Sequence, residues 1–256
     1  MPTTLSLTGA TIAFANTVTG GALTLNGGSI TFPSAGAVNL SSFSLATGSI
    51  DTWPSSITTS GALTFTPHLV IPEGIVPSLT GFPITFSNSV EGPGGLSFQG
   101  GNITFIDLVG NVKNLSVLSV DAGSLVGWPL SISAQQLIFT SPVDIDSGVV
   151  SNLTGTGSIE FSSTVDGPGG LILNGDIVFD DLVGSGTSLS SFTLGSGSIT
   201  TWPSSIQAGT LSFIPTISIT QDTTLTATSS DPTINSIIFS DKIEGAASLT
   251  LNGINI

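Results

Sequence analysis

The sequence of 256 residues contains no cysteine, no arginine and no tyrosine, and it has a single histidine. Without cysteine the chain can form neither a disulfide framework nor a cysteine-ligated metal site, and one histidine cannot supply a multi-histidine zinc site. The absence of cysteine is compatible with an exported protein that avoids disulfides, although it does not fix the compartment.

Positive charge is also scarce. Lys113 and Lys242 stand against 16 acidic residues, and the net charge is −14. Such a chain is repelled by polyanions, so we exclude binding to nucleic acid or to an acidic lipid surface. Two isolated lysines leave little scope for salt bridges. Backbone hydrogen bonds and apolar stacking must therefore supply the stability.

Long apolar runs are missing as well, because apolar residues alternate with serine, threonine and glycine. No run reaches the length needed to cross a bilayer as a helix. Charged residues make up only 7% of the chain and the mean hydropathy is +0.50, which argues against disorder. The first residues have neither a basic start nor an apolar core, so we expect no signal peptide. These features predict an all-β fold.

What the chain does contain is a repeated unit, clearest in residues 157–183. Two Ile-x-Phe segments, residues 159–161 and 177–179, lie 18 positions apart. Between them are a Gly-Pro-Gly-Gly turn and a third alternating segment, residues 171–173, which an Asn-Gly pair closes. The same design recurs in residues 84–105. Short period-two strands separated by turn residues are typical of β-structure.

Three sets of anchors show that the unit belongs to a longer repeat of about 75 residues. The anchors are Ile-x-Phe at Ile12, Ile84, Ile159 and Ile237, Trp-Pro at Trp53, Trp128 and Trp202, and Leu-x-Phe at Leu63, Leu137 and Leu211. Each long repeat divides into steps of about 18 to 22 residues. We take each step as one turn, which predicts 12 to 13 turns for the whole chain. We predict super-repeats at approximately 12–83, 84–158 and 159–236, with a partial copy at 237–256, in one continuous domain spanning 1–256.

A constant step favours a parallel β-helix (β-solenoid) over a β-sandwich, which is the main alternative. Sandwich strands have individual environments, whereas solenoid coils stack like residues about 4.8 Å apart. We therefore expect Ile159 over Ile177 and Phe161 over Phe179 as interior columns. The three Leu-Asn-Gly segments, at Asn26, Asn174 and Asn252, should occupy equivalent corners, and the proline-rich residues 67–83 should form a decorated coil.

The sequences at both ends of the chain match parts of the repeat, and neither end has an amphipathic helix or a charged cap. Terminal repeats of solenoids usually need a polar cap, and bare strand edges invite pairing with another chain. We interpret the ends, including the last one at Ile256, as points where the solenoid continues by covalent bonds or by head-to-tail stacking.

Two segments carry a family resemblance. Residues 165–175, Val-Asp-Gly-Pro-Gly-Gly-Leu-Ile-Leu-Asn-Gly, and residues 221–226 before Ile237–Phe239 resemble repeats of bacterial filamentous-haemagglutinin-like and autotransporter-like surface proteins. The resemblance covers almost the whole chain through degenerate repeats. It implies an exported, right-handed parallel β-helix at the bacterial cell surface or outside the cell, acting as a stalk or an adhesive surface. It supplies no catalytic motif.

Possible chemistry is confined to a few side chains. His68 has no counterpart in the other repeats and no nucleophile motif beside it, so we interpret it as a loop residue. The predicted register stacks Asn88 on Asp107 and Ser163 on Asp181. Such oxygen-rich pairs could bind Ca²⁺, but the calcium nonapeptide is absent, and we favour solvated, hydrogen-bonded corners.

An enzyme would need paired acids beside a groove. Asp144, Asp146 and Asp166 are candidates, but they have no aromatic sugar platform, and the scarcity of basic residues disfavours lyase chemistry. The Trp-Pro pairs could form an exposed row, although we favour corner residues that pack over the apolar edge. An ice-binding face is disfavoured because Thr-Thr pairs such as Thr58–Thr59 and Thr200–Thr201 do not recur at every coil.

We therefore expect no catalytic, cofactor-binding or metal-binding residue. The predicted function is a non-enzymatic extracellular stalk or fibre subunit whose partner is a second copy of itself, joined head to tail. The alternative is an adhesive segment of a large bacterial surface protein, which binds glycans or a host surface through loops such as residues 70–82.

Overall fold

The computed structural model describes residues 4–229 and 236–253. This part of the chain is all-β, contains no helix, and stacks its parallel strands as a β-solenoid of about 11 turns. The predicted fold class is thus confirmed, with slightly fewer turns than the 12 to 13 expected. None of the described residues belongs to a helix that is long and apolar enough to cross a membrane. The interpretation of Ile256 as an open edge lies outside the described residues.

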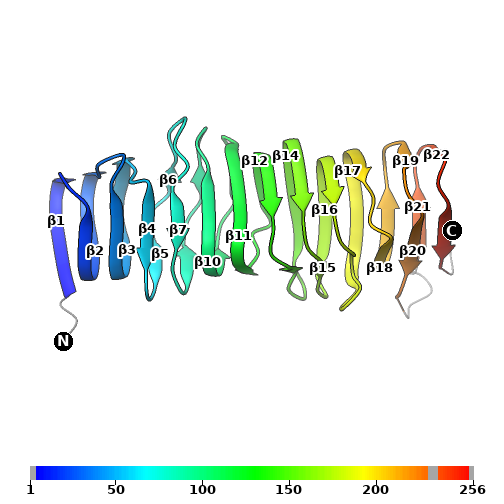
Figure 1. Ribbon diagram of the computed structural model, residues 1–256, viewed down its shortest axis with the longest axis horizontal. Helices are drawn as coiled ribbons and strands as arrows, with labels where there is room; N and C mark the ends of the chain where they lie inside the picture. The colour runs from blue at the N-terminus through cyan, green and yellow to red at the C-terminus, as the bar shows by residue number, and fades with distance from the viewer. Residues whose placement is uncertain (1–3, 230–235, 254–256) are drawn as a thin grey trace. The chain divides into compact units, whose positions relative to one another are not determined.

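The contacts divide the chain into two compact units, Met1–Pro129 and Leu130–Ile256, and each is described by itself. In the first unit successive coils lie side by side (Figure 1). Its strands are β1 (Thr4–Ala13), β2 (Val18–Thr31), β3 (Ala37–Thr52), β4 (Ser56–Thr59), β5 (Leu63–Phe65), β6 (Leu69–Val70), β7 (Ser78–Thr80), β8 (Ile84–Phe86), β9 (Val90–Glu91), β10 (Leu96–Phe105) and β11 (Leu115–Gly127).

The second unit is built in the same way. Its strands are β12 (Ser131–Phe139), β13 (Val143–Asp144), β14 (Val150–Phe161), β15 (Val165–Asp166), β16 (Gly170–Phe179), β17 (Leu189–Thr201), β18 (Ser205–Phe213), β19 (Ile217–Ile219), β20 (Thr223–Ala227), β21 (Ser236–Phe239), β22 (Ile243–Gly245) and β23 (Leu249–Asn252). Each coil pairs in parallel with the coil before it, for example β14 with β16 and β16 with β17.

The interior of the second unit consists of columns of identical residues. Strands β14 and β16 pair Ile159 with Ile177 and Phe161 with Phe179, and all four side chains are buried. The rings of Phe161 and Phe179 stack with centroids 5.2 Å apart and planes 9° from parallel. This offset arrangement adds to the hydrophobic stabilisation of the buried rings. The columns predicted from the repeat are therefore confirmed.

The first unit has a column of the same kind. Phe65, Phe86 and Phe105, at the ends of β5, β8 and β10, stack with centroid distances of 5.0 and 4.8 Å. In the short strands of this column a buried residue alternates with one that is less buried, as in Leu63–Phe65 and Ile84–Phe86. Period two thus sends one set of side chains inward and the other outward.

The proline-rich patch of residues 67–83 forms part of a coil, as predicted. Within it, Leu69 pairs with Val90, and Leu79 lies between Ile57 of β4 and Phe98 of β10. The prolines sit outside the two strands β6 and β7, so they remove no hydrogen bond from the ladder.

Glycines form a second kind of column at one corner of the coils. These glycine columns are Gly9, Gly27 and Gly48, then Gly81, Gly101 and Gly123 in the first unit, and Gly155, Gly175 and Gly197 in the second. A Cβ atom added to Gly197 would come within 3.0 Å of the carbonyl oxygen of Gly175, closer than real Cβ contacts allow. Gly197 also has a φ of +84°, which favours glycine. Neighbouring coils can therefore approach closely at this corner only because no side chain separates them.

Candidate functional site

The strongest candidate site is a corner motif that occurs once in each unit. Residues 53–57 and residues 202–206 share the sequence Trp-Pro-Ser-Ser-Ile. In both cases the tryptophan follows a long strand, β3 or β17, and the serine pair leads into the next strand, β4 or β18. Proline cannot donate a hydrogen bond to the ladder, so it ends the strand and turns the chain. Each motif lines a hollow in the surface.

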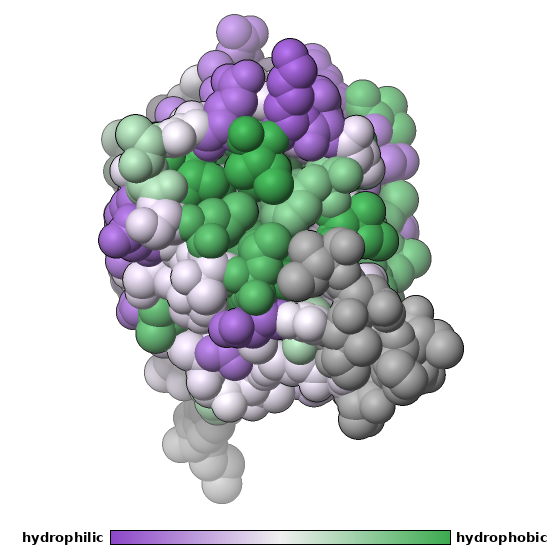
Figure 2. All heavy atoms as spheres, turned by 90° about the vertical axis from the view of Figure 1, so that its right-hand side faces the viewer, coloured by the Kyte–Doolittle hydropathy of each residue, from purple (hydrophilic) through white to green (hydrophobic). Residues whose placement is uncertain are grey.

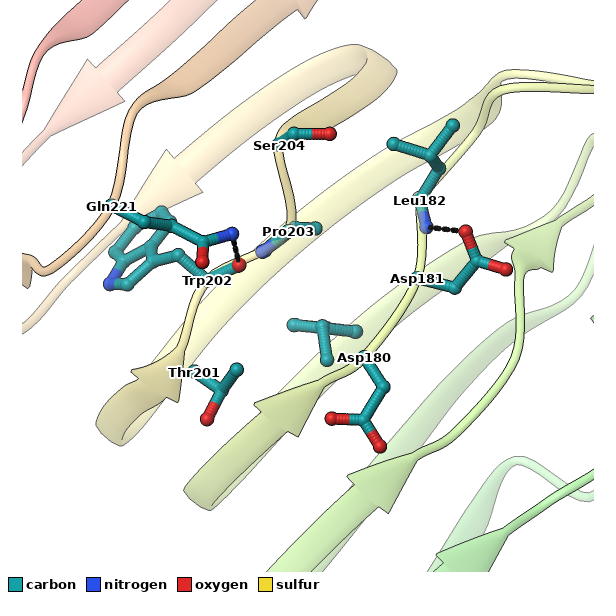
Figure 3. Close-up of a pocket in the computed structure, with 9 residues that line it drawn as sticks. Asp180, Asp181, Leu182, Thr201, Trp202, Pro203, Ser204 and Gln221 are labelled. Atoms are coloured by element: carbon teal, nitrogen blue, oxygen red, sulfur yellow. Dashed lines mark hydrogen bonds between the residues drawn. The ribbon is translucent and has the colours of Figure 1, made fainter.

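In the second unit the hollow has a volume of about 240 Å³ and is mostly polar. Figure 3 shows Asp180, Asp181 and Leu182 on one side and the Trp-Pro-Ser corner on the other. The indole Nε1 of Trp202 donates a hydrogen bond of 2.7 Å to the backbone carbonyl of Ser218, and the side chain of Gln221 donates to the carbonyl of Trp202. These bonds fix the corner against the following coil.

The hollow of the first unit has a volume of about 170 Å³ and a more apolar lining that includes Ile75, Val76 and Pro77. Ser34 lines this hollow two residues after Phe32, whereas Asp181 lines the other hollow two residues after Phe179. The indole Nε1 of Trp53 is buried and has no hydrogen-bond partner. The two hollows thus share a corner but not a set of polar groups.

The tryptophans themselves are part of the core. Trp53 and Trp202 are each 1% exposed and Trp128 is 7% exposed. Their rings pack beside the phenylalanine columns, with centroids 5.9 Å apart for Trp53 and Phe65 and 6.0 Å apart for Trp202 and Phe213. An exposed row of tryptophans is therefore ruled out, and the interpretation of these residues as packed corners is confirmed.

At the coil corners that carry an aspartate or an asparagine, the side chain makes a local hydrogen bond to the backbone. Asn88, Asp107 and Asp181 each accept a bond from the backbone N–H of the next residue, with lengths of 2.9, 2.8 and 2.8 Å. The register of the flanking strands stacks Asn88 on Asp107 and Ser163 on Asp181, as predicted. Among the residues that the structure describes, no group of three or more His, Cys, Asp or Glu side chains could hold a metal ion.

The candidate acids of the second unit are brought together only in part. Asp144 and Asp166 lie in register on β13 and β15. The Oδ1 atom of Asp166 accepts bonds from the backbone N–H groups of Gly186 and Thr187, at 2.9 and 3.4 Å. This carboxylate therefore orders the loop of the next coil. Asp146 lies outside the strands, in the turn that its own carbonyl closes with the N–H of Val149.

His68 is an exposed loop residue, as interpreted from the sequence. Its Nδ1 atom lies 2.7 Å from the Oγ atom of Ser89, one coil further along. A histidine that activates a serine nucleophile would make a contact of this length. Here, however, the backbone N–H of Ser89 is bonded to Asn88, and the serine belongs to a polar corner on the outside of the coil. The contact links two coils across the surface.

Outward-facing serines and aspartates form small ladders across neighbouring coils. Asp51 accepts hydrogen bonds from the hydroxyls of Ser29 and Ser49, and these bonds lower the pKa of its carboxyl group. Asp121 is bridged in a similar way by Ser97 and Gln99. The hydroxyl of Thr216, followed by the backbone N–H of Lys242, lowers the pKa of Asp241. These hydrogen bonds thus favour the ionised carboxylates of Asp51 and Asp241.

Comparison with family models, curated proteins and solved structures finds no match to this chain. The function of this chain must therefore be inferred from the contacts of its own residues. The polar hollow beside Trp202 offers hydrogen-bond acceptors and hydroxyls, but its tryptophan ring packs into the core instead of facing the opening. What the structure places together most consistently is one coil upon the next.

The glycine columns are the feature that the sequence analysis missed. Their members recur at the same offset in each super-repeat, as in Gly27, Gly101 and Gly175. That recurrence could have revealed them, but with 32 glycines in the chain the general preference of glycine for turns concealed the pattern. The pairing of Asp51 and Asp121 with serines on the same and the neighbouring strand depends on exact register and has no comparable signal in the sequence.

Proposed function

We propose that the chain is a non-enzymatic structural β-solenoid, a stalk or fibre subunit outside the cell or at the bacterial cell surface, which assembles head to tail. The observation that carries this proposal is that, within each unit, neighbouring coils pair in parallel and stack like residues on one another. Interior columns of like residues form this interface, and glycine columns bring three groups of three coils close together. An interface of this kind can be repeated by one more coil, whichever chain supplies it.

Apolar side chains of the first and last described coils are more exposed than their partners on the neighbouring coils. Leu5 on β1 is 53% exposed, whereas Leu23, its partner on β2, is 3% exposed. On the last described coil, in the second unit, Leu249 and Leu251 are only half-buried, while Leu225, which pairs with Leu251, is fully buried. Figure 2 looks onto the side of the molecule that carries the C-terminal strands and shows hydrophobic residues gathered near its centre. Apolar surface of this kind favours contact with a partner.

The bacterial location and the likeness to filamentous-haemagglutinin-like surface proteins belong to the same proposal. Repeats such as residues 165–175 motivate them. The fold is compatible with such a protein, as it is with other β-helix repeat proteins. Export also fits a chain that uses no cysteine and needs no disulfide.

We expect the purified protein to form filaments whose length increases with protein concentration. At pH 7 each chain carries a net charge of −14, so copies repel one another. Added salt screens this repulsion, and lowering the pH towards the pI of about 4.1 removes charge, so both changes should lengthen the filaments. Electron microscopy and light scattering across a salt series at pH 7 and across a pH series test this expectation.

The salt series is the control for the pH series, because it changes repulsion without titrating any group. Ordered filaments must be seen in micrographs, since an amorphous precipitate near the pI would also scatter light. Single-chain particles at every concentration, salt level and pH would contradict head-to-tail assembly.

An adhesive segment is the second candidate function, and one observation favours it. The segment of residues 70–82 exposes three apolar side chains, with Val70 52%, Val76 45% and Phe82 62% exposed. Phe82 could stack on a sugar ring or pack against a receptor. This surface replaces the tryptophan row as the place where a ligand would bind.

If the segment is adhesive, the wild-type protein should bind at least one glycan or host receptor, and Phe82→Ala should weaken that binding by roughly 2- to 12-fold. Val126→Ala, which truncates another exposed side chain in the same unit, should leave the affinity unchanged. A glycan array followed by titration of any ligand found measures both variants. No ligand on the array, or equal losses in the two variants, would remove the support for adhesion.

A further inference from the structure

We propose that β23 of one copy pairs in register with β1 of a second copy, so that the partner at this contact is the chain itself. This inference rests on the proposed function, and it adds the two strands, their register and their polarity. The register would place Leu249 beside Leu5, Thr250 beside Ser6, Leu251 beside Leu7 and Asn252 beside Thr8.

The first argument is that both strands belong to the same sequence unit. The unit reads Leu-x-Leu, then threonine or asparagine, then glycine, and it occurs at residues 5–9, 23–27, 171–175 and 249–253. Its first two occurrences pair with each other within the chain, in the register Leu5 with Leu23, Leu7 with Leu25 and Gly9 with Gly27. Strand β1 thus already pairs on one side with the sequence Leu-Thr-Leu-Asn-Gly, and that sequence is repeated at β23.

The second argument is polarity. Strand β1 pairs with β2, the strand that follows it in the chain, and β23 pairs with β20, which precedes it. Within the described residues, the edge of β1 away from β2 and the edge of β23 away from β20 have no paired strand. Placing one against the other continues the parallel order of the coils. The contact joins two different surfaces, so it is heterologous and a further copy can repeat it.

The third argument is the apolar surface that the contact would cover. Beside β1 lies a cavity of about 180 Å³ whose lining includes Leu5, Phe14, Val18, Leu23 and Leu40. Neither β1 nor β23 contains a charged residue. A coil placed on β1 would bury these side chains in the way that β1 itself helps to bury Leu23. Because neither strand carries a charge, the contact would bury no ionised side chain and would avoid that desolvation penalty.

The absence of native cysteine makes the register testable by disulfide formation. Ser6 and Thr250 are exposed and alternate with the inward leucines, so Ser6→Cys and Thr250→Cys introduce one outward thiol each. Cα atoms of residues opposite each other in adjacent strands lie about 4.8 Å apart, which is within the range that a disulfide spans. Equimolar Ser6→Cys and Thr250→Cys proteins should give the mixed disulfide, and the double variant should give a covalent ladder of oligomers.

Two further variants calibrate the experiment. Ser6→Cys with Thr24→Cys places both thiols in a register that the chain already has, so it should form an internal disulfide. Ser6→Cys mixed with Ser147→Cys, which lies in an exposed turn, measures random collision. We expect the Ser6–Thr250 pair to exceed this background by about tenfold or more, because contact raises the effective concentration of the two thiols. Mass spectrometry of the cross-linked peptides identifies each pair.

The possible outcomes separate this inference from the function on which it rests. Filaments that form without the Ser6–Thr250 disulfide would overturn the proposed contact and leave the fibre function standing. A predominance of Ser6–Ser6 disulfides would also overturn it, because it would indicate a head-to-head contact. Wild-type protein that stays monomeric in every condition would overturn both. The mixed disulfide above background, in protein whose unfolding curve matches the wild type, supports the contact.

Discussion

Replacing Phe161 with alanine should lower the free energy of unfolding by about 3–5 kcal/mol. Phe161 is fully buried between Phe139 and Phe179, and the ring centroids are 5.1 and 5.2 Å apart. Alanine at this position removes the stacking contacts on both sides and leaves a cavity, because the backbone ladder holds the neighbouring coils at a fixed spacing. Urea unfolding followed by circular dichroism measures the change.

The matched control is Ile214→Ala, which truncates an apolar side chain in the same unit that is 50% exposed. Its free energy of unfolding should stay within about 0.5 kcal/mol of the wild type. If Phe161→Ala and Ile214→Ala destabilised the protein equally, the phenylalanine column would not be a main source of its stability.

The second large effect is expected at a residue with no side chain. Gly197→Ala should lower the free energy of unfolding by about 2–5 kcal/mol. Part of this loss comes from the positive φ of +84°. The rest arises because the new methyl group would overlap the carbonyl oxygen of Gly175 on the preceding coil. Neither atom can move without breaking the parallel register of β16 and β17.

Gly148→Ala separates these two causes. Gly148 has nearly the same φ, +79°, but nothing lies within 4 Å of the position where its Cβ atom would be. Its substitution should cost about 1–2 kcal/mol for the backbone conformation alone. The difference between the two variants in the same unfolding assay measures the close approach of the coils. Similar losses for both glycines would mean that the glycine column is not a packing requirement.

The fold could be predicted from the sequence because its interior is periodic. Ile159 and Phe161 recur as Ile177 and Phe179, and a solenoid is the fold in which residues at a constant step share one environment. The position of each column follows from that step alone. Even the proline-rich coil could be placed, because Leu69 and Leu79 keep the inward pattern on either side of the prolines.

The candidate site could be predicted only in part. The Trp-Pro pairs were visible, but a tryptophan at a corner can face solvent or the core, and the choice depends on the neighbouring coil. For Trp202 the next coil supplies the carbonyl of Ser218, whereas the Nε1 atom of Trp53 has no partner. Two identical pentapeptides therefore have different surroundings. The sequence of the motif does not contain that difference, because it arises in residues 16 or more positions away.

The repeated coil interface also has an evolutionary consequence. In the second unit the segment from Gly175 to Ser196 begins and ends at the same point of the coil, because Gly175 lies in register with Gly197. Duplicating or deleting such a segment would present the neighbouring strands with the same leucine, isoleucine and glycine positions as before. The length of a solenoid like this can therefore change by unequal recombination in whole turns, while selection on the packing of each turn stays the same.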